Sequence, residues 1–330
     1  MATTNHPTKR IVKFSVPGFK PDVRLKVFDN LEFHVHSIML KIHSGFFRKF
    51  LDSPEKKIPA SAEFAYEWVT KIDDDMSWHL IAAQYRTIEA EQNVGALGEH
   101  QAHEERTFEK LLLAIYNKPY AIDKLNDLIH LTKLADYYCA LRIVSRTLDA
   151  AMLSSSSFGL DVFKHPLKAM PLAVQLRNRI LYKECLILLQ GPWTDARFHD
   201  LQDPQLLKRA TKLNDQIYTA IGKVSLGLTG FMSTVEYQIL DDYMEKTART
   251  SVMHRSQVIN APSYYRQLYE FRWHLGSNPF GAYIEPTILV KNDLKLNSGL
   301  VSGQGLASRY FLGGSIPDED LPWDTTEEDW

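Results

Sequence analysis

The sequence has few cysteines, no long apolar run and almost no net charge. Its 330 residues include only two cysteines, Cys139 and Cys185, too few and too widely spaced for a disulfide framework. The longest apolar runs, such as Cys185–Leu189, are far too short to cross a bilayer. The formal net charge is −2, so no overall basic field attracts nucleic acid. These features argue against a disulfide-stapled fold, a membrane-spanning chain and a nucleic-acid-binding protein.

The beginning of the chain lacks a secretory signal pattern. Its first ten residues, MATTNHPTKR, are polar and contain no apolar stretch. Hydrophobic residues make up 45% of the chain and charged residues 24%, which is typical of a globular protein. We expect an intracellular protein, in the cytoplasm or the nucleus, that binds neither nucleic acid nor membranes.

Motifs for catalysis and cofactor binding are also missing. The sequence has no P-loop and no Gly-x-Ser-x-Gly elbow. The pair Gly303 and Gly305 neither follows a strong strand pattern nor precedes a helix pattern, so it does not predict a phosphate cradle. Asp73–Asp75 lacks the glycine and distal glutamate of a calcium loop and instead predicts a turn at a strand end. We therefore expect no enzymatic activity, no cofactor and no metal.

Three histidines nevertheless crowd into the stretch FHVHSIMLKIHSGFFRKFL. His34 and His36 have strand spacing, and His43 belongs to the helix that follows. A zinc site needs a third and usually a fourth ligand, for which Cys139 and Asp22 are the candidates. A metal-dependent enzyme built on these three histidines is the distant alternative to a structural role.

Alternating apolar residues predict strands near the beginning of the chain. Val23–Val27 and Leu31–Val35 alternate on either side of Asp29-Asn30, a pair suited to a tight hairpin. The stretch Phe64–Ile72 predicts a third strand. Between them, Ser37 and Ser44 are placed to cap two short helices.

Helix patterns follow, beginning with a polar stretch at 87–106 that predicts a mobile insertion or a solvated helix. Within it, His100 and His103 have metal-compatible helical spacing, but a solvated charged face is the favoured interpretation. Apolar residues repeat with helical period in 107–120, 125–138 and 143–152. The serine run 154–157 predicts a boundary.

The second half of the chain predicts helices only. Pro171 is expected to open a helix that reaches Gln190, and Pro204 opens the next. Ser233 and Glu236 form a capping-box pattern. The helix expected over 262–276 carries an aromatic face that we interpret as core rather than as a partner groove; its residues are Tyr264, Tyr265, Tyr269, Phe271 and Trp273.

Residues 277–330 are rich in Gly, Ser and Pro and end in an acidic segment. This composition predicts a low-order tail. Its Trp323 and Trp330 allow two alternatives, a disordered end without a role or a segment that docks onto a partner or onto its own domain.

The fold class that these patterns predict is α+β, with a small mixed sheet flanked by helices and an all-α region after it. We expect an N-terminal arm at 1–19, a domain at 20–152, a helical region at 153–276 and a tail at 277–330.

The first domain resembles a BTB/POZ domain. The motif residues run in the family's order: Asp22, Val23, Leu25, Val27, Phe33, Val35, His36, Leu40, Ser44, Phe47 and then Phe108, Leu111, Leu112, Ile115 and Tyr116. The phrases YEWVTKIDDD, IYNKPY and LADYYCALRIVSRTL are similar to the expanded BTB group of filamentous fungi. LRNRILYKECLILLQGPW is similar to the region that follows BTB in that group.

The resemblance implies a protein–protein interaction module that forms homodimers. Many family members are substrate adaptors for a cullin-based ubiquitin ligase, and others are scaffolds in transcription or signalling. Self-association is then expected through 12–16 and the 22–51 surface, and Glu55 in LDSPEKK would supply the acid of the cullin-binding motif. The implied partner and dimer surface consists of Asp22, Val23, Leu25, Phe33, His36, Leu40, Phe47, Leu51 and Glu55. The partners expected are a second copy, a cullin and an unknown protein substrate.

Overall fold

The protein has a mixed α+β fold with a helical C-terminal region. The computed structural model describes residues 9–28, 30–53, 63–85, 98–234, 238–253, 258–271, 284, 287–327 and 330. Two compact units form the chain. Unit 1 consists of Met1–Ile122 and Asn126–Ala151, and unit 2 of Asp123–Leu125 and Met152–Trp330.

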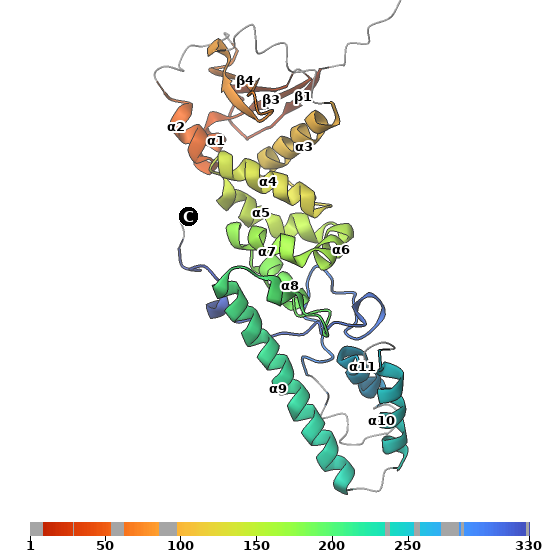
Figure 1. Cartoon of the computed structure of the whole chain (residues 1–330). Helices are drawn as coiled ribbons and strands as arrows, with labels where there is room; N and C mark the ends of the chain where they lie inside the picture. The colour runs from red at the N-terminus through yellow and green to blue at the C-terminus, as the bar shows by residue number, and fades with distance from the viewer. Residues whose placement is uncertain are drawn as a thin grey trace, which may run out of the picture. The chain divides into compact units, whose positions relative to one another are not determined.

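Unit 1 contains a five-stranded mixed sheet in the order β1-β3-β2-β4-β5 (Figure 1). Its strands are β1 (Arg10–Lys13), β2 (Val23–Val27), β3 (Leu31–Val35), β4 (Tyr66–Ile72) and β5 (Trp78–Ala82). The sequence patterns predicted β2, β3 and β4 but missed the strands at both edges. β1 pairs with β3 in parallel and is part of the predicted N-terminal arm.

The hairpin between β2 and β3 is antiparallel, as predicted. Asp29 itself lies outside the described residues, but the positive φ that the turn requires is found at Phe28 (φ 53°). The Phe28 amide donates to the Thr70 hydroxyl of β4 at 2.9 Å. Asp73–Asp75 forms the predicted turn, which leads from β4 into the antiparallel strand β5.

Two short helices follow the hairpin, α1 (Ser37–His43) and α2 (Gly45–Phe50). Ser44 caps α2 as predicted, because its hydroxyl accepts the Phe47 amide at 3.2 Å. The Ser44 hydroxyl also donates to the Tyr138 carbonyl at 2.6 Å and thereby ties α2 to a distant turn. The predicted Ser37 cap is wrong, since Ser37 is the first helical residue and does not cap α1.

Helices α3 (Gly98–Ile115), α4 (Leu125–Tyr137) and α5 (Leu141–Leu153) complete unit 1. The last two confirm the predicted ranges closely. α3 begins within the stretch expected to be a mobile insertion or a solvated helix; residues 98–106 are helical, whereas 86–97 lies outside the described residues. The prediction of a solvated charged face is wrong for Glu104, because its side chain is buried.

Aromatic side chains from distant segments form the core of unit 1. Phe47 stacks on Tyr138 with ring centroids 5.4 Å apart, and Trp68 meets Phe47 edge-on at 6.1 Å. Phe108 of α3 contacts both Phe33 at 5.8 Å and Tyr138 at 5.7 Å. These contacts join the sheet, α2, α3 and the α4–α5 turn into one core.

Unit 2 begins with α6 (Ser156–Lys164), α7 (Pro166–Gln175) and α8 (Arg179–Leu188). The prediction of one helix from Pro171 to Gln190 is wrong, because Pro171 lies inside α7 and the chain breaks at 176–178. Arg177 has a positive φ of 46°, which ends the first helix. Asn178 then caps α8, its side chain accepting the Leu181 amide at 2.8 Å.

Three further helices follow, α9 (Pro204–Thr234), α10 (Gln238–Ser251) and α11 (Ala261–Phe271). Pro204 opens α9 as predicted. The Ser233 capping box is wrong, since Ser233 belongs to the last turn of α9, while Glu236 lies outside the described residues. In α11, Tyr265, Leu268 and Phe271 are buried in a core cluster, which confirms the core interpretation; Trp273 lies outside the described residues.

Residues 287–327 are not a low-order tail, contrary to the prediction. They contain little regular structure, yet Leu289, Phe311 and Leu312 are among the buried core residues. Composition misled the prediction because irregular backbone becomes ordered when buried side chains and specific acceptors hold it. Glu184 of α8 is one such acceptor, taking hydrogen bonds from the amides of Lys295 and Leu296.

Candidate partner-binding surface

Most of the residues predicted as a partner surface are core residues instead. Burial is complete or nearly complete for seven of them: Val23, Leu25, Phe33, His36, Leu40, Phe47 and Leu51. The prediction of a surface role is therefore wrong for these seven. The motif specifies the packing of the sheet and the first two helices, which explains its apolar character.

Asp22 is partly exposed and organises the start of α1. Its carboxylate accepts the Ser37 amide at 2.7 Å and the Ser37 hydroxyl at 2.5 Å. The charge thus lies at the N-terminus of α1, where unpaired amides and the helix dipole favour an anion. Asp22 provides the capping interaction that the prediction assigned to Ser37. The remaining predicted residue, Glu55, lies outside the described residues.

His36 is a structural residue at the junction between β3 and α1. Its backbone amide donates to the Tyr116 hydroxyl at 2.7 Å, and its Nδ1 lies 2.9 Å from the same oxygen. On the other side of the ring, Nε2 lies 3.3 Å from the Phe19 carbonyl oxygen. Burial raises the pKa of Tyr116, so the hydroxyl stays protonated.

The other two histidines of the stretch lie in different surroundings. His34 Nε2 lies 2.6 Å from Glu32 Oε1, and burial and nearby Arg146 lower the pKa of His43. In the part of the chain that the structure describes, no group of three or more His, Cys, Asp or Glu side chains is arranged to hold a metal. The three histidines do not converge on a common site.

Three apolar side chains are exposed around the junction that His36 holds. Ile38 and Ile42 are 45% and 55% exposed, and their i, i+4 spacing places them on one face of α1. Phe19, which is 58% exposed, is tied to the same end of α1 through its carbonyl and His36. We call Phe19, Ile38 and Ile42 the α1 patch. Ile38 and Ile42 lie within the 22–51 surface that was expected to self-associate, but the residues predicted there are the buried side chains of the family motif, and Phe19 lies outside that range.

His100 and His103, whose spacing is compatible with metal binding, lie in a histidine–carboxylate cluster on α3 and α4. The rings of His103 and His130 lie 4.5 Å apart. Glu104 accepts the indole N–H of Trp78 at 3.0 Å and lies 3.2 Å from His130 Nδ1. Burial and then His130 lower the pKa of His103. The cluster therefore holds His103 neutral in the folded unit at neutral pH.

This cluster predicts a loss of stability in mild acid. Because the pKa of His103 is lower in the folded than in the unfolded chain, the unfolded chain binds more protons as pH falls through about 6.5. Unit 1 should keep its full stability above that pH and lose part of it towards pH 5.5. We expect thermal unfolding to show a smaller difference between pH 7.5 and 5.5 in His103→Gln than in the parent.

Other groups also contribute to the pH dependence of stability, so His103→Gln should reduce this dependence without abolishing it. Asp127, Glu104 and Arg106 also act on His103, and His43 has a lowered pKa in the same unit. His43→Gln serves as the matched variant, and the double variant should be the flattest. An unchanged pH profile in the double variant contradicts the assignment.

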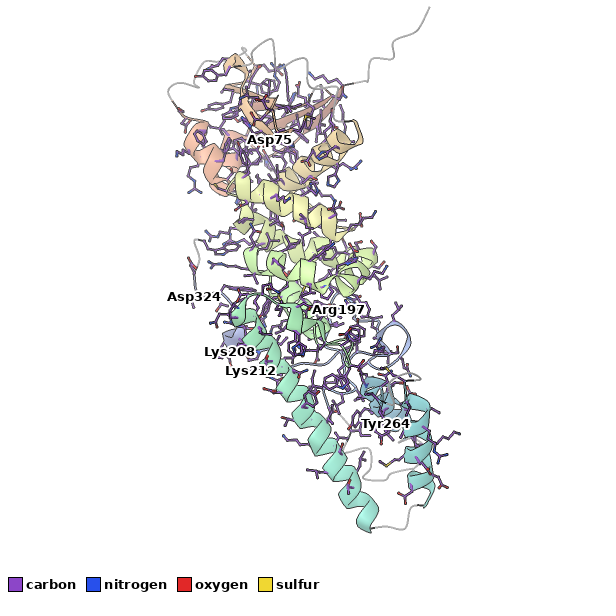
Figure 2. The ribbon with its side chains drawn as sticks, viewed as in Figure 1. Asp75, Arg197, Lys208, Lys212, Tyr264 and Asp324 are labelled. Carbon is purple, nitrogen blue, oxygen red and sulfur yellow. The ribbon has the colours of Figure 1, made fainter. Side chains whose placement is uncertain are left out.

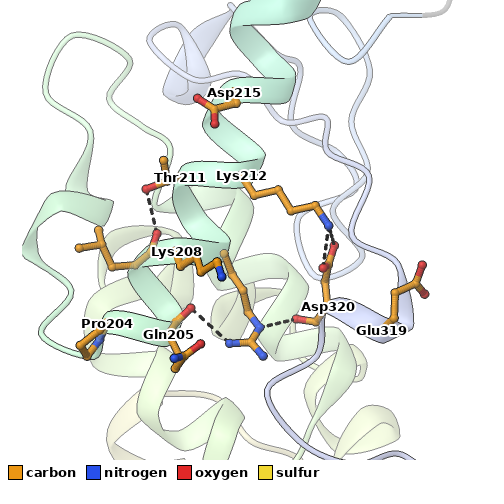
Figure 3. A pocket seen from close by; sticks show the side chains of 10 residues that line it. Pro204, Gln205, Lys208, Thr211, Lys212, Asp215, Glu319 and Asp320 are labelled. Carbon is orange, nitrogen blue, oxygen red and sulfur yellow. Dashed lines mark hydrogen bonds and ion pairs between the residues drawn. The ribbon is translucent and has the colours of Figure 1, made fainter.

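Unit 2 has an open hollow of about 760 Å³ beside the first turns of α9 (Figure 3). Its lining is polar and charged, with Lys208, Lys212 and Asp215 from α9 opposite Glu319 and Asp320. No nucleophile–base pair lines it, since its hydroxyl, Thr211, donates to the Leu207 carbonyl at 3.0 Å. The lining favours recognition of a charged group over catalysis.

Comparisons with known proteins give no relative for this chain. No protein-family model, no curated protein and no solved structure matches it. Within the described residues, no helix is long and apolar enough to cross a membrane. The interpretation of the α1 patch therefore depends on the chain's own geometry and on the resemblance of its motifs.

Proposed function

We propose that unit 1 is a BTB/POZ-like interaction module that self-associates through the α1 patch. The observation that carries this proposal is the exposure of Phe19, Ile38 and Ile42 beside a fully buried junction. Exposed apolar side chains that gather at one place mark interaction sites when their neighbours are well packed. The motif that resembles the BTB family supplies the packed framework beneath the patch.

The framework is rigid where an interface requires it. The Asp22 carboxylate holds the start of α1, and Ser44 holds the start of α2 against the Tyr138 carbonyl. A patch on a fixed helix loses little conformational entropy on association. Two copies that meet through α1 would bury the isoleucines of both and leave Lys41 and Lys49 near the polar rim.

The more specific proposal is a substrate adaptor for a cullin-based ubiquitin ligase. The resemblance supports it, and unit 2 would then recruit the protein substrate. A scaffold without a ligase link is the outcome expected if self-association occurs but the cullin does not bind.

Light-scattering mass on the full chain tests the self-association. We expect a concentration-dependent dimer for the parent chain and a monomer for Ile38→Asp/Ile42→Asp, with dimer affinity at least about a hundredfold weaker because each copy would bury two charges at the interface. Leu226→Asp is the matched control, since Leu226 is 75% exposed on α9, and it should leave the mass unchanged.

The same measurement, repeated with the N-terminal half of the BTB-binding cullin, separates the two forms of the proposal. A complex of chain and cullin supports the adaptor, and a dimer that ignores the cullin supports the scaffold. A parent chain that stays monomeric at all concentrations contradicts the proposed self-association.

A further inference from the structure

The acidic segment 317–330, of which the structure describes residues 317–327 and 330, lies against a basic surface of unit 2. Five basic residues from α8, α9 and the preceding turn contact this segment, and we call them the basic strip: Arg177, Arg179, Lys183, Arg209 and Lys212. The C-terminal acidic residues therefore have specific partners, although the composition of the sequence predicted a low-order tail there.

Two carboxylates at the start of the segment form ion pairs with the strip. Asp318 Oδ2 lies 2.9 Å from Arg179 Nη1, and its Oδ1 lies 3.3 Å from Lys183 Nζ. The ammonium of Lys212 reaches both carboxylate oxygens of Asp320 at 2.7 Å (Figure 3). Asp318 thus pairs with cations of α8, and Asp320 pairs with a cation of α9.

Arg209 adds a contact that requires the backbone of the segment. Its Nε donates to the Asp320 carbonyl at 2.9 Å. Further along, Glu327 pairs with Arg177 at 2.8 Å.

Both tryptophans of the segment also have partners. Trp323 meets the ring of Tyr182 edge-on at 5.5 Å. The guanidinium of Arg177 lies 4.6 Å from the centre of the Trp330 ring, a cation–π distance. The strip and the adjoining Tyr182 therefore contact both the charges and the aromatic rings of the segment, a combination that gives peptide binding its specificity.

The contacts of 317–330 differ in kind from those of the residues before it. Leu289 and Leu312 are fully buried, and Gly313 packs so closely on Ile288 that a Cβ would lie 2.4 Å from its carbonyl oxygen. Within the described part of 317–330, only Leu321 is well buried. In the outermost pair, Arg179 and Asp318 are 59% and 46% exposed. Exposed ion pairs are weak and are screened by salt, so the segment is held reversibly.

The open hollow extends the strip beyond the segment. Lys208 and Lys212 follow one another along α9 (Figures 2 and 3). Lys208 is exposed, and among the described residues no carboxylate lies within ion-pair distance of it. A longer acidic ligand would find this cation and the hollow free beside Asp320.

We propose that the basic strip is a docking site for an acidic, tryptophan-bearing peptide segment of a partner protein, which residues 317–330 occupy in cis as a reversible latch. A tethered segment acts at a high effective concentration, so a partner peptide binds the closed chain weakly and the opened chain well. This inference does not depend on self-association of unit 1.

A labelled peptide with the sequence of residues 316–330, IPDEDLPWDTTEEDW, is the probe. Fluorescence anisotropy is measured on the full chain and on the full-length variant Asp318→Asn/Asp320→Asn/Glu327→Gln, whose latch has lost the three carboxylates that pair with the strip. We expect the variant to bind the peptide at least about tenfold more tightly than the parent chain. That binding should weaken about tenfold between 50 and 300 mM NaCl.

Two controls locate the binding on the strip. Adding Lys183→Glu/Lys212→Glu to the latch variant should remove the binding, because both cations pair with the segment. A peptide in which every acidic residue is replaced by its amide should not bind. Circular dichroism confirms that each variant is folded; a latch variant that fails to fold shows that the segment is structural and overturns the proposal.

Hydrogen exchange on the unmodified chain provides a second test without any substitution. Residues 317–327 should exchange faster than 288–316, and 0.5 M salt should accelerate only the former. The proposal is overturned if both stretches are equally protected, or if the folded latch variant binds the peptide no better than the parent.

Discussion

Replacing Trp68 by alanine is expected to lower the free energy of unfolding of unit 1 by about 3–5 kcal/mol. Trp68 is 2% exposed, pairs in register with Leu25 of β2, and meets the rings of Phe46 and Phe47. Its removal leaves a cavity at the place where the sheet and α2 meet, and packed neighbours relax only partially into such a space.

Hydrogen exchange on the full chain measures this effect where it occurs. The amides of β2, β3 and β4 should exchange about a hundredfold to a few thousandfold faster in Trp68→Ala, because each 1.4 kcal/mol is a factor of ten in the opening equilibrium. Trp68→Phe, which keeps a ring, should lose clearly less. Equal exchange in the alanine variant and the parent would show that Trp68 does not hold the core together.

Replacing Glu184 by alanine is expected to cost unit 2 about 2–5 kcal/mol. Glu184 lies on α8 and accepts the amides of Lys295 and Leu296, while its second oxygen lies 3.4 Å from Asn297 Nδ2. Asn297 in turn donates to the Gly159 carbonyl at 2.8 Å. Alanine leaves buried donors without an acceptor, and the irregular segment 292–300 loses its anchor.

Glu184→Gln is the matched variant for this prediction. Burial raises the pKa of Glu184, so the site already disfavours the negative charge, and a neutral amide oxygen of the same size still accepts a hydrogen bond. We expect the Gln variant to lose much less stability than the Ala variant. Faster exchange should appear at 292–300 and not in β2–β4; the opposite distribution would contradict the assigned anchor.

Signals contained within a short stretch predicted the elements that the structure confirms. The alternation on either side of Asp29-Asn30 predicted β2 and β3, Ser44 predicted the start of α2, and Pro204 predicted the start of α9. In each case, the residues that decide the structure lie within a few positions of one another. Asn178 carried a similar cap signal for α8, and the prediction overlooked it in favour of Pro171.

The elements that the prediction missed depend on distant partners. The edge strands β1 and β5 are only four and five residues long, and each exists through its pairing with β3 or β4. Glu104 lies in a stretch whose charged composition predicts a solvated face. It is buried, however, and contacts Trp78 and His130. A local pattern contains no information on such partners.

The sequence by itself determined the α+β class, the hairpin, the helix starts marked by Ser44 and Pro204, and the motif that resembles a BTB domain. Only the tertiary structure decided which side chains of α1 face outward, leaving Ile38 and Ile42 exposed while Leu40 of the motif is buried. It also decided that 287–327 is ordered and that Asp318, Asp320 and Glu327 within it meet the basic strip. The physical reason is that burial and ion pairing join residues more than a hundred positions apart, and these contacts form only when the chain has folded.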